Sequence, residues 1–401
     1  MSKRVGGFIN QDGLNAPDAP TGVSGTAGNT QVTVSFTPPT DVGGANVTGY
    51  RVQSNDGIGA SGSSSPVTVT GLTNGTSYTF NVWAINPFGW SSPSDASGSV
   101  SPSALAGNVI YFFGGYGGSA VNTIDFRNVA STGNASDFGD LTSVSDGGAG
   151  CASTTRGIAV KGKNASGQSR DIDYVTLQTT GNATDFGDTT LQRSQMAGLS
   201  SSTRGVFGGG LLGTDRQNRI DYITIASTGN GTDFGDLQES KRGVSGASSP
   251  TRGLFFGGDI DGNTSSNNID RIEIASTGNA ANFGDLSATR SVTAAVSSNI
   301  RAVVCAGANG SGDAVNIMEY VTIASTGNTT DFGDTTVAKT DLAGDGCGTL
   351  GLIGGGYASS NYLNVMESIT IASTGNGSDF GDLTIARREL GAFSSAHGGL
   401  S

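Results

Sequence analysis

The sequence predicts an all-β protein of two unlike parts, and three observations carry this prediction. Glycine supplies 66 of the 401 residues and charged residues only 13%, a composition typical of short strands joined by turns. A unit of about 48 residues recurs six times in residues 108–401. Residues 17–102 lack this unit and hold eight of the nine prolines. The glycines follow no collagen period and the charge is too sparse for an unfolded chain, which excludes both classes.

The repeated unit is most constant where Ser-Thr-Gly-Asn is followed by Asp-Phe-Gly-Asp. Four short segments recur in fixed order around it, and the third alternates in side-chain character, as in residues 220–225. Four strands in about 50 residues are typical of one propeller blade. We therefore predict a six-bladed β-propeller in which Gly-Asn forms tight hairpin turns. The first glycine of the motif recurs at steps of 48 or 49 residues, at Gly133, Gly181, Gly229, Gly278, Gly327 and Gly375.

The order of the motifs resembles that of the kelch family. A strand ending in a glycine pair precedes an alternating strand with an aromatic residue, and a closing aromatic follows. Here the closing residue is Phe where kelch units have Trp, so the resemblance implies a divergent kelch-like propeller over residues 108–401. The glycine pair stands at 114–115, 209–210, 257–258 and 355–356, and is altered to Lys161-Gly162 and Ala306-Gly307.

The two ends of the repeat region complete each other. Residues 108–115 read as the second strand of a unit, and residues 385–399 contain a copy of the first strand. The C-terminal strand is therefore expected to close the ring, which would leave no exposed sheet edge.

The front of the chain, residues 17–102, is similar to a fibronectin type III domain. The segment 72–78 leads into an alternating strand and places Tyr78 at the tyrosine-corner position, while Phe36 stands where the family usually has Trp. Residues 1–16 are interpreted as an extended arm and residues 103–107 as a linker. The arm combines basic and apolar side chains in an acidic chain, so it is expected to dock onto another protein through Lys3, Arg4, Phe8 and Ile9. A frayed terminus is the alternative.

Charge and composition exclude several functions. A net charge of −12 and 21 basic residues without a basic cluster argue against nucleic acid as partner. No apolar run is long enough to span a membrane, and the start of the chain lacks the apolar stretch of a signal peptide. The single histidine, His397, excludes metal sites built on several histidines. No metal or cofactor is expected.

Three motifs have a structural and a catalytic interpretation. The carboxylates of Asp-Phe-Gly-Asp recur in every unit, which favours turn capping over catalysis. Residues 259–263 resemble half a calcium loop but lack its bidentate Glu, which favours a surface turn. Four arginines at one repeat position resemble a sialidase cluster, but that family's Ser-x-Asp-x-Gly-x-Thr-Trp boxes are absent. Bridges between neighbouring blades are the expected role of Arg156, Arg204, Arg252 and Arg301.

The repeats differ most in the loops between their second and third strands. Because strands alternate in direction, all six loops are expected on one face of the ring, and binding residues tend to lie on variable loops of a rigid scaffold. Neutral drift of solvent-exposed loops is the alternative. The candidate ligand-binding residues are Tyr116, Asp215, Arg216, Asp259, Asp261, Tyr357 and Tyr362.

The combination of arm, fibronectin-like module and Gly/Ser/Thr-rich propeller resembles structural proteins of tailed bacteriophages, including cyanophages. The resemblance implies a non-enzymatic virion protein, made in the host cytoplasm and located in a tail or head appendage. Its N-terminal part would dock to other virion proteins and its propeller would adhere to a host-surface glycan. A scaffold that only joins virion proteins and a glycan-acting propeller enzyme are the alternatives, although no catalytic residues are expected.

Overall fold

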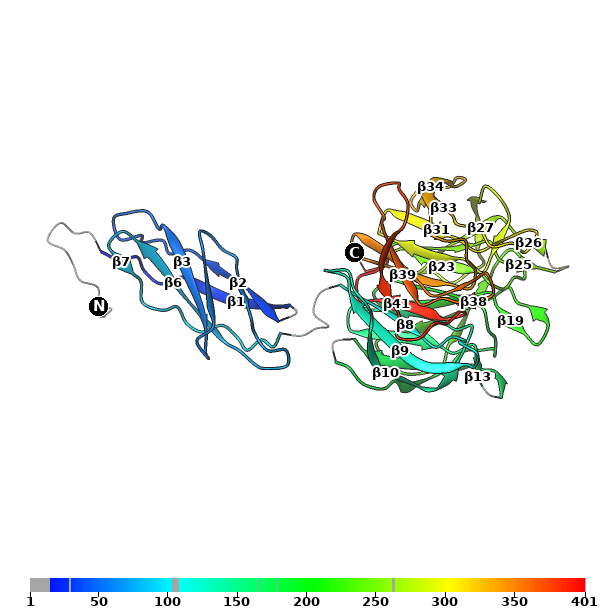
Figure 1. The fold of residues 1–401 in the computed structure, drawn as a ribbon, viewed down its shortest axis with the longest axis horizontal. Coiled ribbons are helices and arrows are strands. Elements are labelled where there is room, and N and C mark those ends of the chain that lie inside the picture. Colours follow the sequence, from blue (N-terminus) through cyan, green and yellow to red (C-terminus); the bar gives the residue numbers. More distant parts are fainter. Residues whose placement is uncertain are drawn as a thin grey trace. The chain divides into compact units, whose positions relative to one another are not determined.

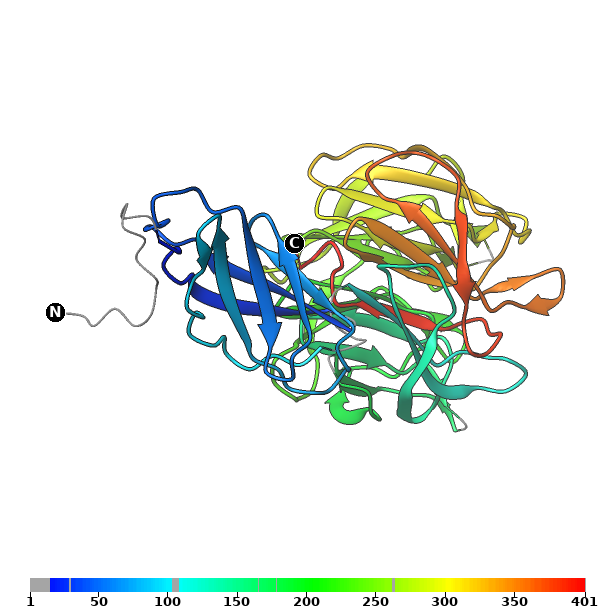
Figure 2. The same cartoon turned by 60° about the vertical axis from the view of Figure 1, so that its left-hand side comes forward.

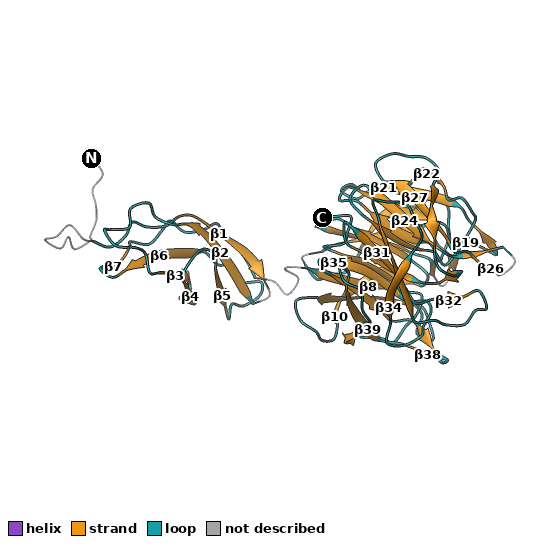
Figure 3. Cartoon of the chain, turned by 90° about the horizontal axis from the view of Figure 1, so that it is seen from above, coloured by secondary structure: helices purple, strands orange, loops and turns teal. Residues whose placement is uncertain are grey.

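The computed structural model describes residues 15–28, 30–102, 108–164, 166–177, 179–261 and 264–400. The chain divides into two compact units, Met1–Gly107 and Asn108–Ser401 (Figure 1). All regular secondary structure within these described residues is β-strand (Figure 3). No helix that could span a membrane occurs in this part of the chain. The predicted docking residues Lys3, Arg4, Phe8 and Ile9 and the predicted linker 103–107 lie outside the described residues.

The first unit is a sandwich of two antiparallel sheets. One sheet has the order β1–β2–β5 and the other the order β4–β3–β6–β7. The alternating burial of β2 turns Val32, Val34 and Phe36 inward, where they meet the buried side chains of β6. The strands are β1 (Thr21–Gly28), β2 (Gln31–Thr37), β3 (Gly49–Ser54), β4 (Gly59–Gly62), β5 (Val67–Thr70), β6 (Phe80–Asn86) and β7 (Gly89–Trp90).

Two local features complete the sandwich. The Tyr78 hydroxyl accepts a hydrogen bond from the Thr73 amide at 3.1 Å, as expected for a tyrosine corner. Beyond β7, the buried Ser91, Ser94 and Ser97 run along β6, and their hydroxyls accept from its amides at 2.9–3.0 Å. Serine at every third position therefore pairs the edge of β6 after the regular strand has ended.

The second unit consists of six four-stranded antiparallel sheets with one common strand order. In five of them the strands follow the chain, whereas the sixth joins the C-terminal strand β41 to β8, β9 and β10. In Figures 1 and 2 the red C-terminal strand lies among the cyan and teal strands that begin this unit. The strands of three sheets are β41 (Gly391–Ser394), β8 (Val109–Phe113), β9 (Val121–Asn128), β10 (Ser136–Ser145); β11 (Ala149–Ala152), β12 (Arg156–Val160), β15 (Asp171–Thr176), β16 (Thr184–Asp188); and β17 (Ala197–Ser200), β18 (Arg204–Gly208), β21 (Arg219–Thr224), β22 (Thr232–Asp236).

The other three sheets repeat this arrangement. Buried apolar side chains of adjacent sheets form common clusters, as where Leu254 and Phe256 meet Ala302 and Val304. The hydrophobic core therefore lies between the sheets. The strands are β23 (Ser245–Ser248), β24 (Arg252–Phe256), β27 (Asn268–Glu273), β28 (Ala281–Asp285); β30 (Ala294–Ser297), β31 (Arg301–Cys305), β33 (Ile317–Thr322), β34 (Thr330–Asp334); and β35 (Ala343–Cys347), β36 (Leu350–Gly354), β39 (Val365–Thr370), β40 (Ser378–Asp382).

Backbone hydrogen bonds connect the starts of the six first strands in a cycle. In each step an amide donates to the carbonyl of the equivalent residue one repeat earlier, at 2.7–3.0 Å. The amide of Gly147 donates to Glu389, so the cycle has no open end. Its members are Gly147, Gln195, Gly243, Val292, Asp341 and Glu389.

The Ser-Thr-Gly-Asn motif connects neighbouring sheets instead of forming the expected tight hairpin. The segment between β15 and β16 spans residues 177–183, and Gly181 and Asn182 lie at its end against the preceding sheet. The Gly181 amide donates to the Phe138 carbonyl at 2.9 Å, and the Asp140 amide donates to Asn182 Oδ1 at 3.1 Å. The equivalent bond from Asp382 to Asn134 joins the last repeat to the first.

Candidate binding site on the hairpin face

The six variable connections emerge at equivalent ends of the six sheets, and we call this side of the second unit the hairpin face. Each connection pairs with the segment that precedes the first strand of its own sheet, as in the bridges Tyr116–Arg388 and Thr340–Tyr357. Figure 1 labels β13, β19, β25, β26 and β38 together on this side. The short strands of the face are β13 (Lys163–Asn164), β14 (Gly167–Gln168), β19 (Leu211–Leu212), β20 (Asp215–Arg216), β25 (Asp259–Ile260), β26 (Thr264–Ser265), β29 (Arg290–Ser291), β32 (Ala308–Asn309), β37 (Tyr357–Ala358) and β38 (Asn361–Tyr362).

Three of the predicted residues meet around one arginine. The guanidinium carbon of Arg388 lies 4.9 Å from the ring centre of Tyr357, 5.9 Å from Tyr116 and 6.0 Å from Tyr362. The ring of Tyr362 lies 5.9 Å from Tyr116 and 5.6 Å from Tyr357, centre to centre. The three half-buried rings and Arg388, which we call the tyrosine cluster, form an aromatic surface with a cation beside it.

Local backbone geometry fixes this cluster. Tyr357 and Tyr362 are a cross-strand pair of a hairpin whose central residues, Ser359 and Ser360, have φ of 48° and 65°. These values fit the type I′ turn that two-residue hairpins favour, although serine adopts it less readily than glycine. On the other side, the backbones of Tyr116 and Arg388 exchange two hydrogen bonds of 2.8 and 3.1 Å.

Carboxylates lie beside the tyrosine cluster. Arg388 Nη1 lies 4.0 Å from Asp341 Oδ2, and the Thr340 hydroxyl donates to the same oxygen at 2.9 Å. Burial, with a smaller contribution from Glu389, raises the pKa of Asp341 to about 6, although Thr340, Arg388 and Arg242 oppose this shift. Burial also raises the pKa of Asp146, again with a contribution from Glu389.

The other four predicted residues lie away from the tyrosine cluster. Arg216 on β20 approaches the exposed Asp261 at 3.5 Å. Asp259 on β25 pairs with Arg242 at 3.4 Å and accepts a hydrogen bond from Ser265 at 3.1 Å. Asp215 is exposed at the turn of its hairpin. The seven candidates thus share one face but do not form one site.

The carboxylates of the calcium-like loop face different arginines. Asp259 faces Arg242 and Asp261 faces Arg216, while residues 262 and 263 lie outside the described residues. Among the described residues there is no group of three or more potential His, Cys, Asp or Glu ligands that could hold a metal ion.

Sequence reasoning missed Arg388, Arg242 and Asp341. They lie in the segments before the first strands, whereas the residues predicted from variation between repeats lie in the loops after the second strands. The same comparison of repeats could have found the first two, because their position holds Asp146, Ser194, Arg242, Ser291, Thr340 and Arg388 in the six repeats.

Each of the six sheets also contains one buried ion pair that the sequence analysis did not identify. An acid on the third strand faces a basic residue, with side chains at most 3% exposed. Repetition in all six sheets and full pairing indicate a structural role. The pairs are Arg387–Asp125, Lys161–Asp173, Arg193–Asp221, Lys241–Asp270, Arg290–Glu319 and Lys339–Glu367.

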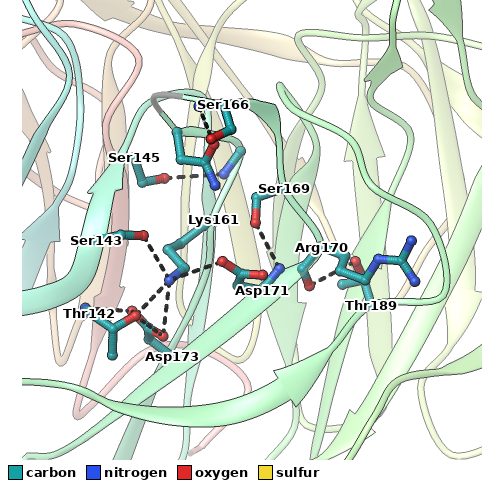
Figure 4. A network of polar contacts seen from close by, with 12 residues as sticks. Thr142, Ser143, Ser145, Lys161, Ser166, Ser169, Arg170, Asp171, Asp173 and Thr189 are labelled. Carbon is teal, nitrogen blue, oxygen red and sulfur yellow. Dashed lines mark hydrogen bonds and ion pairs between the residues drawn. The ribbon is translucent and has the colours of Figure 1, made fainter.

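One of these pairs is built differently. Five basic residues precede a first strand, but Ser145 occupies that position before β11, and Lys161 at the end of β12 supplies the charge instead. Its ammonium lies 3.4 Å from Asp173 and 3.3 Å from Asp171 and donates to Thr142 at 2.6 Å (Figure 4). The lysine in the altered glycine pair Lys161-Gly162 therefore supplies the positive charge that is absent at Ser145.

The four repeat-equivalent arginines bridge neighbouring sheets, as predicted. Nη1 of Arg156 donates to the Ile225 carbonyl at 2.9 Å, and Arg204, Arg252 and Arg301 make the corresponding bond one sheet further on. Arg156 also lies 4.4 Å from the ring centre of Tyr174. These arginines contribute to the contacts between sheets and do not converge on a site.

Comparison with known proteins concerns the first unit. Residues 18–99 match the family described as fibronectin type III domain. The comparison with curated proteins gave no match. The two-sheet sandwich and the tyrosine corner agree with the family match. Residues 18–99 are a fibronectin type III domain.

Proposed function

We propose that residues 108–401 form a six-bladed, kelch-like β-propeller. The six sheets of equal strand order would be its blades, and the first strands would line its axis. Two cyclic sets of hydrogen bonds support the proposal, one between first strands and one through the Ser-Thr-Gly-Asn motifs. The pairing of β41 with β8 would close the ring.

We propose further that the chain is a non-enzymatic virion protein that adheres to a host-surface glycan through the hairpin face. The carrying observation is the tyrosine cluster, because aromatic faces bind the apolar faces of sugars while Arg388 and nearby carboxylates can bind hydroxyls. Docking to other virion proteins through the N-terminal part rests on the phage resemblance. Synthesis of the protein in a host cytoplasm also rests on that resemblance.

The glycan proposal is tested by removing one ring of the cluster. Tyr362→Ala and Tyr116→Ala should each lower binding of the full chain to host cells and to a glycan array by about tenfold, the effect of losing one aromatic contact of about 1.4 kcal/mol. Trp90→Ala is the matched control, because Trp90 is an aromatic residue 57% exposed on the first unit. Unchanged binding of both tyrosine variants would contradict the proposal.

A glycan-acting enzyme remains the second candidate, and one observation favours it. Asp341 has a raised pKa and lies near Glu389, and enzymes that hydrolyse glycosidic bonds use two carboxyl groups, one of which donates a proton. The test is the release of reducing ends from a polysaccharide incubated with the chain. Release that Asp341→Asn abolishes would support hydrolysis and contradict non-enzymatic adhesion. A scaffold without a host ligand would show neither binding nor release.

A further inference from the structure

A cavity of the hairpin face lies beside the tyrosine cluster. It has a volume of about 440 Å³ and opens between β25–β26 and the turn of residues 309–312. Arg242, Asp259 and Ser265 line one side, and Thr340 and Asp341 line another. The volume falls within the range of about 300–1,000 Å³ that is typical of small-molecule sites.

Donors and acceptors converge on this cavity. Arg242 Nη2 lies 3.4 Å from Asp259 Oδ2, and the Ser265 hydroxyl donates to the other oxygen of Asp259 at 3.1 Å. The Thr340 hydroxyl donates to Asp341 at 2.9 Å. The buried Nε of Arg242 has no hydrogen-bond partner among the described residues. A ligand here would meet a cation, two carboxylates and several hydroxyls within one hollow.

We propose that this cavity binds one neutral pyranose ring of the glycan. A sugar ring carries hydroxyls that both donate and accept, which matches carboxylates and a guanidinium at the same time. An anionic ligand would face Asp259 and Asp341 with only Arg242 from the lining to balance them. The side chains of Val292 and Ala308 supply a small apolar part of the wall for the C–H face of the ring.

One residue of the cavity wall also contacts the tyrosine cluster. Asp341 lines the cavity and faces Arg388, which lies against the three rings. An oligosaccharide could therefore place one ring in the cavity and a neighbouring ring on the tyrosines. The proposal deepens the adhesion function and rests on it for the source of the sugar, whereas binding to the cavity can be measured by itself.

The experiment uses the full chain and saturation-transfer NMR. The probes are D-glucose, D-galactose, D-mannose and N-acetyl-D-glucosamine at about 10 mM, because single sugars commonly bind in the millimolar range. D-glucuronate is the anionic comparison. At least one neutral sugar should bind. Thr340→Val and Asp259→Asn should each weaken that binding about tenfold, since each removes polar partners of a buried ligand.

Asp313→Asn is the control, because Asp313 is exposed on the same loop and does not line the cavity. Binding of no neutral sugar, binding unaffected by both cavity variants, or preferential binding of D-glucuronate would each overturn the proposal. Tyr362→Ala separates the two proposals, because it should lower cell adhesion about tenfold and leave the monosaccharide signal intact. A chain that binds sugars in the cavity but does not adhere to cells would refute only the adhesion function.

Discussion

The charge of Lys161 explains why the glycine pair of the second repeat is altered. Lys161 stands where four other repeats have glycine. Its ammonium replaces the basic side chain that five repeats have at the position of Ser145. Burial of an acid at Asp173 requires a cation, but the sequence does not say from which strand the cation comes. The buried acids themselves, such as Asp221, could have been read from an acidic residue inside an apolar alternating strand. Their partners could not, because they are distant in sequence.

Lys161→Met should destabilise the second unit by about 3–5 kcal/mol, because it leaves the buried Asp173 without its cation. Lys161→Met/Asp173→Asn should recover much of this loss, since the uncompensated charge is then gone. Urea unfolding followed by circular dichroism measures both. The exposed pair Arg219–Asp233 provides the control, and Arg219→Met should change stability by less than about 1 kcal/mol. Equal losses in the Lys161 and Arg219 variants would contradict a buried-charge effect.

At the scale of elements, the repeat predicts the strands well and their connections less well. The repeated pattern predicted four strand segments per unit and the bridging arginines. Gly-Asn was predicted to form a hairpin turn, because local patterns indicate φ preferences but do not show which neighbour the segment contacts. In the structure, Asn182 belongs to a contact between sheets. The invariance of the motif follows from this contact, in which two glycine backbones approach each other.

The glycine of Phe-Gly-Asp is required by that approach. A Cβ on Gly187, whose φ is 140°, would lie 2.6 Å from the Gly229 carbonyl oxygen of the next repeat. Gly187→Ala should therefore lower stability by about 1–3 kcal/mol more than Gly181→Ala, the additional loss being overpacking. Gly181 is the matched control, because its φ of 157° is similar and a Cβ there would meet no atom within 4 Å. Equal melting temperatures of the two variants would show that backbone strain alone acts.

At the scale of the whole molecule, the C-terminal segment joins several sheets. His397 Nε2 lies 2.9 Å from the Ala152 carbonyl and 3.2 Å from the Ser200 hydroxyl, which belong to two neighbouring sheets. The Gly399 amide donates to His397 Nδ1. The sequence predicted that the C-terminal strand completes a sheet, but the role of His397 depends on the Ala152 carbonyl and the Ser200 hydroxyl, which are 245 and 197 residues away and leave no local signal. The tyrosine cluster differs in this respect: its three rings were predicted, and Arg388, which was missed, stands at a variable position of the repeat.

The burial of His397 makes the stability of the second unit sensitive to acid. Burial lowers the pKa of His397 from 6.5 to about 4. A pKa depressed in the folded state gives stability that is present above pH 6.5 and is lost as the pH falls toward 4. The loss should reach about 3 kcal/mol. Asp345, whose pKa burial raises to about 8, acts in the opposite direction over this range, because its protonated form is favoured in the folded state.

His397→Gln isolates the histidine contribution, because it removes that titration and leaves Asp345 unchanged. The difference in unfolding free energy between wild type and variant should shift by about 3 kcal/mol, in favour of the variant, between pH 7 and pH 4. Both tryptophans, Trp83 and Trp90, lie in the first unit. Tryptophan fluorescence therefore reports that unit, and a circular-dichroism transition without a fluorescence change reports the second. A difference that is constant with pH would mean that burial does not keep His397 neutral in the folded protein.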